Sequence, residues 1–167
     1  MALQIGKNVD IDDSVELGSD VVLRDNVNLR YVVVGPGTKI GRNTIIFGSR
    51  DHPVQIGTGC FISPNCFMNG AAGLSLGDEV TIAPGVNIST DSGPNVGPLK
   101  EYYPTKASEI TIGAGAWVGS GAVLLPGAQM GAASVLGANS TLTAKVGPYE
   151  VFAGNLAKRV KRLDVQK

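Results

Sequence analysis

The single histidine of this 167-residue chain, His52, is the first candidate for chemistry. The ordinary pKa of a histidine suits proton transfer near neutral pH, so His52 could act as a general base. Its neighbours Arg50 and Asp51 could orient an acceptor, or could form an ordinary surface ion pair. A lone histidine in a loop is also often structural or exposed to solvent, so both interpretations of His52 stay open.

The segment 89–109 is the second candidate, because it contains Asp91 and two of the four tyrosines, Tyr102 and Tyr103. A long segment without secondary structure is uncommon in a compact domain and is usually functional or disordered. An aspartate carboxylate is a weak base for a hydroxyl group and is better suited to holding an amine. We therefore take Asp91 as a candidate catalytic residue, and Tyr102 and Tyr103 as candidate acceptor-binding residues. The alternative is a solvated loop that packs on a neighbouring subunit.

Basic residues are concentrated at the C-terminal end, where they could bind phosphate groups. Val160 and Leu163 stand at roughly helical spacing, so residues 157–167 are predicted to form a short helix that caps one end of the fold. A solvated basic face is the alternative. The cations of this segment are Lys158, Arg159, Lys161, Arg162 and Lys167.

The overall composition excludes several classes of protein. The chain has 14 basic and 14 acidic residues, so it has no global field for nucleic acid. No apolar run reaches the roughly 18 residues that a membrane span needs, and the first residues lack the pattern of a signal peptide. We therefore expect a soluble, cytoplasmic protein without a nucleic-acid partner or a membrane span. The 23 glycines and the aromatic content of 5% favour a regular β architecture.

An internal repeat of six residues positions these candidates. Aliphatic residues recur at every sixth position, and a small residue follows four positions after nearly all of them. This pattern has neither the period of an antiparallel strand nor that of a helix, so it predicts a solenoid of short strands. Insertions interrupt it three times, and one residue is deleted between Leu29 and Val34. The aliphatic positions are Ile5, Ile11, Leu17, Leu23, Leu29, Val34, Ile40, Ile46, Ile56, Ile62, Met68, Leu76, Ile82, Ile88, Ile112, Val118, Leu124, Met130, Leu136 and Leu142.

Both cysteines, Cys60 and Cys66, occupy small positions of the repeat. We interpret them as core residues, because a free cysteine behaves as a small hydrophobic side chain. Asn65 precedes Cys66 in a Ser-Pro-Asn turn, where asparagine is an ordinary residue.

The repeat resembles that of the hexapeptide-repeat acyltransferases over nearly the whole chain. The resemblance implies an all-β fold, a left-handed parallel β-helix of triangular section with three hexapeptides in each coil. About twenty hexapeptides would then form about six to seven coils. We assign residues 1–156 to the β-helix, with the loop 89–109 inserted, and residues 157–167 to the basic C-terminal helix or tail.

The second half of the chain is similar to the galactoside, maltose and related sugar acetyltransferases. The similar stretches are Ile82-Ala-Pro-Gly-Val-Asn-Ile88, Ile110-Thr-Ile-Gly-Ala-Gly-Ala-Trp-Val-Gly-Ser-Gly-Ala122 and Tyr149-Glu-Val-Phe-Ala-Gly-Asn-Leu-Ala-Lys158. The resemblance implies acetyl transfer from acetyl-CoA to a hydroxyl or amino group of a sugar or sugar derivative. It also implies a homotrimer that binds CoA between subunits. The cofactor-binding residues that it implies are Ser120, Ala138, Thr143, Lys145, Lys158, Arg159 and Arg162.

The chain departs from these enzymes at the catalytic base. They have a histidine just before the proline of the long loop, where this chain has Gly93. Asp91 or His52 would then take the proton, or an amine acceptor would attack unaided. By the same resemblance, Asn65 approximately matches an asparagine that orients the acceptor.

Two other functions compete with acetyl transfer. A catalytically silent scaffold or regulatory CoA-binding protein is the main alternative, because the usual base is missing at Gly93. A zinc-dependent carbonic anhydrase of the same fold would need several histidines, which one histidine per chain does not supply. We therefore expect no metal cofactor.

Overall fold

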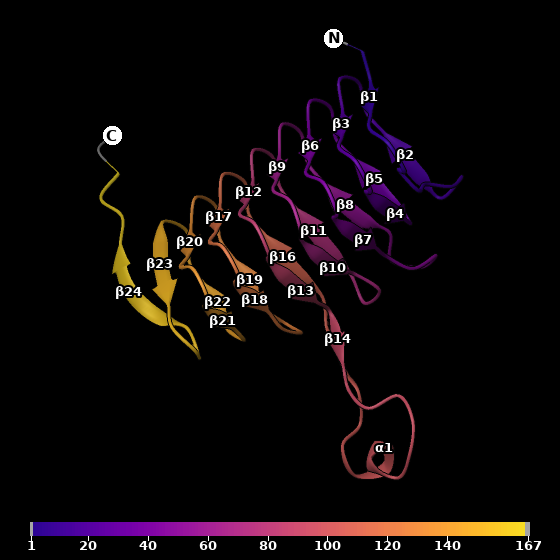
Figure 1. Ribbon diagram of the computed structural model, residues 1–167. Helices are drawn as coiled ribbons and strands as arrows, with labels where there is room; N and C mark the ends of the chain where they lie inside the picture. Colours follow the sequence, from indigo (N-terminus) through magenta and orange to yellow (C-terminus); the bar gives the residue numbers. More distant parts are fainter. Residues whose placement is uncertain (1, 166–167) are drawn as a thin grey trace.

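The computed structural model describes residues 2–165, which form a β-helix of short strands stacked in three sheets (Figure 1). The first sheet contains, in spatial order, β1 (Gln4–Ile5), β3 (Val22–Leu23), β6 (Lys39–Ile40), β9 (Phe61–Ile62), β12 (Thr81–Ile82), β17 (Trp117–Val118), β20 (Val135–Leu136), β23 (Glu150–Ala153) and β24 (Lys158–Arg162). The second sheet contains β4 (Asn28–Arg30), β7 (Ile45–Phe47), β10 (Phe67–Asn69), β13 (Asn87–Ser89), β18 (Val123–Leu124) and β21 (Thr141–Leu142). The third sheet contains β2 (Val15–Leu17), β5 (Val32–Val34), β8 (Val54–Ile56), β11 (Leu74–Leu76), β16 (Ile110–Ile112), β19 (Gln129–Met130) and β22 (Lys145–Val146).

This arrangement confirms the solenoid that the six-residue repeat predicts. Six strands stack in the second sheet and seven in the third, in agreement with the expected number of coils. The chain passes from the first sheet to the second at a first corner, from the second to the third at a second corner, and back to the first at a third corner.

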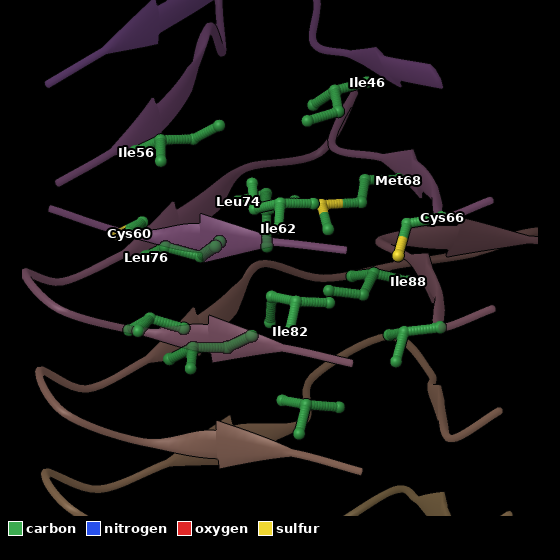
Figure 2. Close-up of a cluster of buried hydrophobic side chains, with 14 of the residues drawn as sticks. Ile46, Ile56, Cys60, Ile62, Cys66, Met68, Leu74, Leu76, Ile82 and Ile88 are labelled. Atoms are coloured by element: carbon green, nitrogen blue, oxygen red, sulfur yellow. The ribbon is translucent and has the colours of Figure 1, made fainter. Parts of the chain in front are cut away.

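The predicted aliphatic column lies inside the coils. Ile46, Met68 and Ile88 are register partners in adjacent strands of the second sheet, and each is fully buried (Figure 2). Burial of such a side chain contributes about 1.5–3 kcal/mol relative to leaving it exposed. Ile5 is an exception, since it is 51% exposed in β1, which stands at the end of its sheet.

Most of the small residues that follow the aliphatic positions by four are also buried, and the buried polar ones form hydrogen bonds. The Thr38 hydroxyl has no exposed surface and donates a hydrogen bond to the Gly57 carbonyl oxygen at 2.8 Å. Cys60 and Cys66 are free, buried thiols, as expected, and burial raises the pKa of both (Figure 2). They are therefore poor nucleophiles and belong to the core.

An asparagine ladder lines the first corner in the N-terminal half. Asn8, Asn26, Asn43 and Asn65 have positive φ angles between 53° and 61°, a conformation that asparagine tolerates better than most residues. Their side-chain amides join successive coils: Asn8 donates to Asn26 at 3.1 Å, Asn26 to Asn43 at 2.9 Å and Asn43 to Asn65 at 3.1 Å. The ladder fixes the corner backbone of one coil against that of the next.

The second corner carries the interruptions of the repeat. The deletion leaves Tyr31 as the whole turn there, with a φ of 52°. The turns 48–53, 70–73 and 90–109 follow at the same corner of successive coils. The excursions 48–53 and 90–109 are therefore two coils apart.

The longest of these turns is an arm, defined here as residues 90–109, that projects from the solenoid (Figure 1). The sequence predicts a loop without secondary structure, but the arm contains three short elements. Strands β14 (Asp91–Ser92) and β15 (Lys106–Ala107) pair antiparallel as a stem, and α1 (Leu99–Tyr102) forms one turn near the tip. This is the only helix between residues 2 and 165, and none in this range is long enough to cross a membrane.

The prediction of a C-terminal helix is wrong. Residues 158–162 form strand β24, which pairs antiparallel with β23 and places Arg162 opposite Glu150. Strand β23 ends the parallel stack, so its outer backbone groups need partners, and this pairing outweighs the weak helical spacing of Val160 and Leu163. Residues 166 and 167 of the expected segment, including Lys167, lie outside the described residues.

Candidate functional site

The second corner brings the two excursions into one connected framework. The Ser49 hydroxyl donates to the Ala71 carbonyl oxygen at 3.0 Å, which ties the turn 48–53 to the turn 70–73. The Ala72 amide donates to the Thr90 hydroxyl at 2.9 Å, which ties the turn 70–73 to the base of the arm. Thr90 is fully buried, so the arm starts from a fixed point.

Asp91 begins the stem of the arm and is half-buried. Its Oδ1 accepts a hydrogen bond of 2.6 Å from Nδ2 of Asn69, the last residue of β10. The Asn69 Oδ1 accepts the Ala71 amide at 3.0 Å, so both ends of the Asn69 amide are committed. A bond from an amide to a carboxylate is charge-assisted and strongly directional. Asn69 therefore fixes the carboxylate of a candidate catalytic residue, a role that sequence analysis misses.

Gly93 follows β14 and lies against Thr105, which precedes β15. A Cβ atom at this position would stand 2.6 Å from the Thr105 Cα and 2.7 Å from the Thr105 Oγ1. Non-bonded carbon atoms do not approach so closely, so any larger residue at position 93 would push the stem apart. The histidine that the resemblance implies at this position therefore has no space in this stem.

His52 lies at the same corner, in the turn 48–53. Its amide donates to the Ser49 hydroxyl at 3.1 Å, which fixes the turn, while its side chain is exposed. It borders a shallow hollow of about 250 Å³ together with Gln55, Ser75 and Glu109. Arg50 and Asp51 form no ion pair within the described part of the chain, so that expected alternative is not observed.

The acceptor-binding candidates divide between two places. Tyr102 and Tyr103 lie at the tip of the arm, are 81% and 54% exposed, and so share an element with Asp91. The Lys106 ammonium stands 5.9 Å from the centre of the Tyr103 ring. Asn65, in contrast, lies at the first corner and accepts the side-chain amide of Asn43. Within one chain the structure does not bring Asn65 to the arm.

The residues expected to bind CoA also lie on more than one corner. Ser120 and Ala138 occupy the first corner in consecutive coils. The turn 154–157 packs next to this corner, where the Ala157 amide donates a hydrogen bond of 2.8 Å to the Thr141 carbonyl oxygen. That turn leads directly into Lys158. The other members lie elsewhere: Thr143 at the second corner, Lys145 on the outer face of the third sheet, and Arg159 and Arg162 along β24.

Part of the C-terminal positive charge is neutralised locally. The Arg159 guanidinium forms an ion pair of 3.3 Å with Glu150. Lys158 and Arg162 form no ion pair among residues 2–165. They remain available to a phosphate group.

Two family models match the repeat region of the chain. The model described as bacterial transferase hexapeptide (six repeats) matches residues 109–144, and the model described as hexapeptide repeat of succinyl-transferase matches residues 53–89. The matches lie on either side of the arm.

A curated relative is similar to this chain over a shorter stretch. An acyl-[acyl-carrier-protein]–UDP-N-acetylglucosamine O-acyltransferase from Rickettsia canadensis is 49% identical over 55 residues. The match covers 31% of this chain and 21% of the length of that relative.

Solved structures extend the similarity to most of the chain. A galactoside acetyltransferase in complex with coenzyme A is 27% identical, with a TM-score of 0.69 over 80% of this chain and 66% of that chain. A variant of AntD, an N-acyltransferase from Bacillus cereus in complex with dTDP-4-amino-4,6-dideoxyglucose and coenzyme A, has a TM-score of 0.80 over 96% of this chain and 86% of that chain. Its identity is 16%, so this second likeness shows the fold alone.

Proposed function

Because this chain is a member of the hexapeptide-repeat acyltransferases, we propose that it transfers an acetyl group from acetyl-CoA to a hydroxyl or amino group of a sugar or sugar derivative. The observation that carries the proposal is the arm at the second corner, where Asn69 holds the Asp91 carboxylate at the base and the exposed Tyr102 and Tyr103 lie at the tip. The similarity to a CoA-bound galactoside acetyltransferase supports the donor and the class of acceptor.

We assign the transfer of the acceptor's proton to Asp91. The acceptor nitrogen or oxygen attacks the thioester carbonyl carbon, and a bond forms there as the carbonyl π electrons move onto oxygen. When the carbonyl re-forms, the C–S bond breaks and the CoA thiolate leaves with the electron pair. The Asp91 carboxylate accepts the acceptor's proton during attack and passes it to the thiolate. Because a carboxylate also pairs well with an ammonium group, Asp91 suits an amino sugar better than a hydroxy sugar.

His52 is the second candidate for the same role. It stands on the same corner two coils away, which corresponds to about 10 Å at the spacing of stacked strands. It would act only if a neighbouring subunit or a movement of the turn 48–53 closed that separation.

We further propose that CoA binds between subunits of a homotrimer. The proposed contacts lie on different corners of one chain, so one groove can gather them only from neighbouring chains. Ile45, Phe67 and Trp117 are outward-facing apolar side chains with 38–52% exposure, and subunit contacts would bury them. A monomer in sedimentation at micromolar concentration, both with and without CoA, would contradict this assembly. The proposed CoA contacts are Ser120, Ala138, Thr143, Lys145, Lys158, Arg159 and Arg162.

The basic strand β24 gives a direct test of the CoA site. Replacing Lys158, Arg159 and Arg162 together by alanine should raise the dissociation constant of CoA by about tenfold or more, at less than about 1 kcal/mol for each exposed contact. Lys161→Ala, on the same strand, is the matched control. Titration calorimetry at low salt decides between phosphate binding and a solvated basic face.

The function itself is tested by release of the CoA thiol from acetyl-CoA with a panel of amino and hydroxy sugars. Asp91→Ala should lower the rate constant with the best acceptor by about 100-fold or more, and His52→Ala should leave most of it. If both single variants and the double variant keep the wild-type rate constant and pH profile, neither residue carries the proton. Saturable CoA binding without transfer to any acceptor would instead favour the silent scaffold.

A further inference from the structure

A hollow of about 500 Å³ lies outside the first sheet and shares no lining residue with the arm or with the proposed CoA contacts. It spans three successive coils, from β3 through β6 to β9, on the side of the first corner. Ile40, Gly41 and Ile62 are among its lining residues, and its size falls within the range of small-molecule sites. The arm leaves from the second corner, so the hollow is a separate feature.

Three cations border this hollow: Arg24, Lys39 and Arg42. None of them forms an ion pair with any acid between residues 2 and 165. The only carboxylate in the lining is Asp25, whose Oδ1 accepts the Lys7 amide at 2.8 Å. The lining therefore has an excess of positive charge, although the whole chain is neutral.

An aromatic side chain completes the lining. Phe61 projects from β9 and is 50% exposed, next to Lys39 in the register of the sheet. An exposed ring beside unpaired guanidinium groups combines the two features that bind nucleotides. The guanidinium group of an arginine can donate two hydrogen bonds to the oxygens of one phosphate, and an aromatic ring can stack on a nucleotide base.

We propose that this hollow binds a nucleoside diphosphate, with its phosphates between Arg24, Lys39 and Arg42 and its base against Phe61. A diphosphate matches the local excess of positive charge, and the concave shape favours a small ligand over a flat polymer surface. The inference goes beyond acetyl transfer and does not depend on it. The nucleotide is either free or the carrier of a sugar, and both share the chemistry that this hollow recognises.

Titration calorimetry at low ionic strength with UDP, ADP and inorganic pyrophosphate tests the proposal. Arg42→Ala should weaken the binding of both nucleotides by about tenfold or more, as expected for loss of a charge-assisted hydrogen bond. Phe61→Ala should weaken the nucleotides by about fivefold or more and leave pyrophosphate unchanged, because only the nucleotides have a base to stack. UDP linked to a sugar should bind at the same site, and its affinity relative to UDP shows whether the sugar adds contacts.

A matched control comes from the same chain. Lys161→Ala removes an exposed cation outside the hollow. It should not change UDP binding, and saturating CoA should not displace UDP.

The proposal is overturned if neither nucleotide binds at millimolar concentration, or if Arg42→Ala binds UDP as the wild type does. It is also overturned if CoA competes with UDP, or if Phe61→Ala weakens pyrophosphate as much as UDP. All variants lie on the surface, and thermal unfolding checks that they fold. None of these results bears on acetyl transfer, which the thiol-release assay measures independently.

Discussion

Replacement of Asn69 by alanine should slow acetyl transfer without weakening the binding of acetyl-CoA. The variant loses the 2.6 Å hydrogen bond that fixes the Asp91 carboxylate, and Asp91 then turns freely at the start of the stem. A hydrogen bond to a charged group contributes about 1.5–3 kcal/mol. If that energy positions Asp91 in the transition state, the rate constant should fall by roughly 13- to 160-fold.

Steady-state release of the CoA thiol with the best acceptor separates positioning from a general structural effect. In Asn69→Ala, kcat should fall while KM for acetyl-CoA stays within about twofold. In Asn69→Asp, a second carboxylate beside Asp91 should favour protonation, so the acid limb of the pH–rate profile should move to higher pH. Asn87→Ala is the matched control, because Asn87 stands on the next strand and its Oδ1 accepts only the Ser89 hydroxyl in the described structure.

A double-mutant cycle makes the test of Asn69 sharper. If Asn69 acts through Asp91, then Asn69→Ala should have little further effect in the Asp91→Ala background. A wild-type kcat and pH profile in Asn69→Ala, with the melting temperature unchanged, would refute the reasoning. Asp91 would then need no fixed orientation, or another group would take the proton.

Three further predictions concern the scaffold. Asn43→Ala removes two side-chain hydrogen bonds and places alanine at a φ of 58°, so the free energy of unfolding in urea should fall by roughly 2–3 kcal/mol. Asn43→Gly should lose less stability, because glycine tolerates that φ. Equal losses in the two variants would contradict the backbone contribution. Burial raises the pKa of the Cys60 and Cys66 thiols above the ordinary 9.0, so these thiols ionise at lower pH in the unfolded chain than in the folded one. The free energy of unfolding should therefore fall as the pH rises above 9.0. In urea titrations, the variant with alanine at both positions should lack this part of the pH dependence. Gly93→Ala should open the stem and speed proteolysis within the arm at an unchanged melting temperature, and a cleavage rate equal to that of Ser92→Ala would count against the close contact with Thr105.

The sequence predicts the solenoid well because each coil obeys the same packing rule. Ile46, Met68 and Ile88 occupy the predicted register and are fully buried, and the deletion after Leu29 appears as the one-residue turn at Tyr31. The asparagine ladder is not among the features predicted from the sequence, although the repeat contains a signal for it. Each of its members stands three residues after an aliphatic position of the repeat, where a turn with positive φ recurs.

The site and the C-terminal segment were less predictable, because they depend on contacts between distant residues. Asn69 stands at an outward position where any polar residue is acceptable, and only the path of the arm brings Asp91 to it. The pairing of β24 depends on where the stack ends, and the spacing of Val160 and Leu163 contains no information about that edge. The close approach of Gly93 and Thr105 likewise follows from the stem and not from local propensity.

The unequal behaviour of the three corners also has an evolutionary consequence. From β3 to β20 the first and third corners keep a constant length, whereas the second corner varies from Tyr31 alone to the whole arm. Since each coil contacts mainly its neighbours, a segment exchanged at the second corner leaves the register of every strand intact. New specificities can therefore be acquired by grafting loops at this one corner, at little cost to folding. The same corner is the natural place to insert a foreign peptide when this solenoid is used as an engineering scaffold.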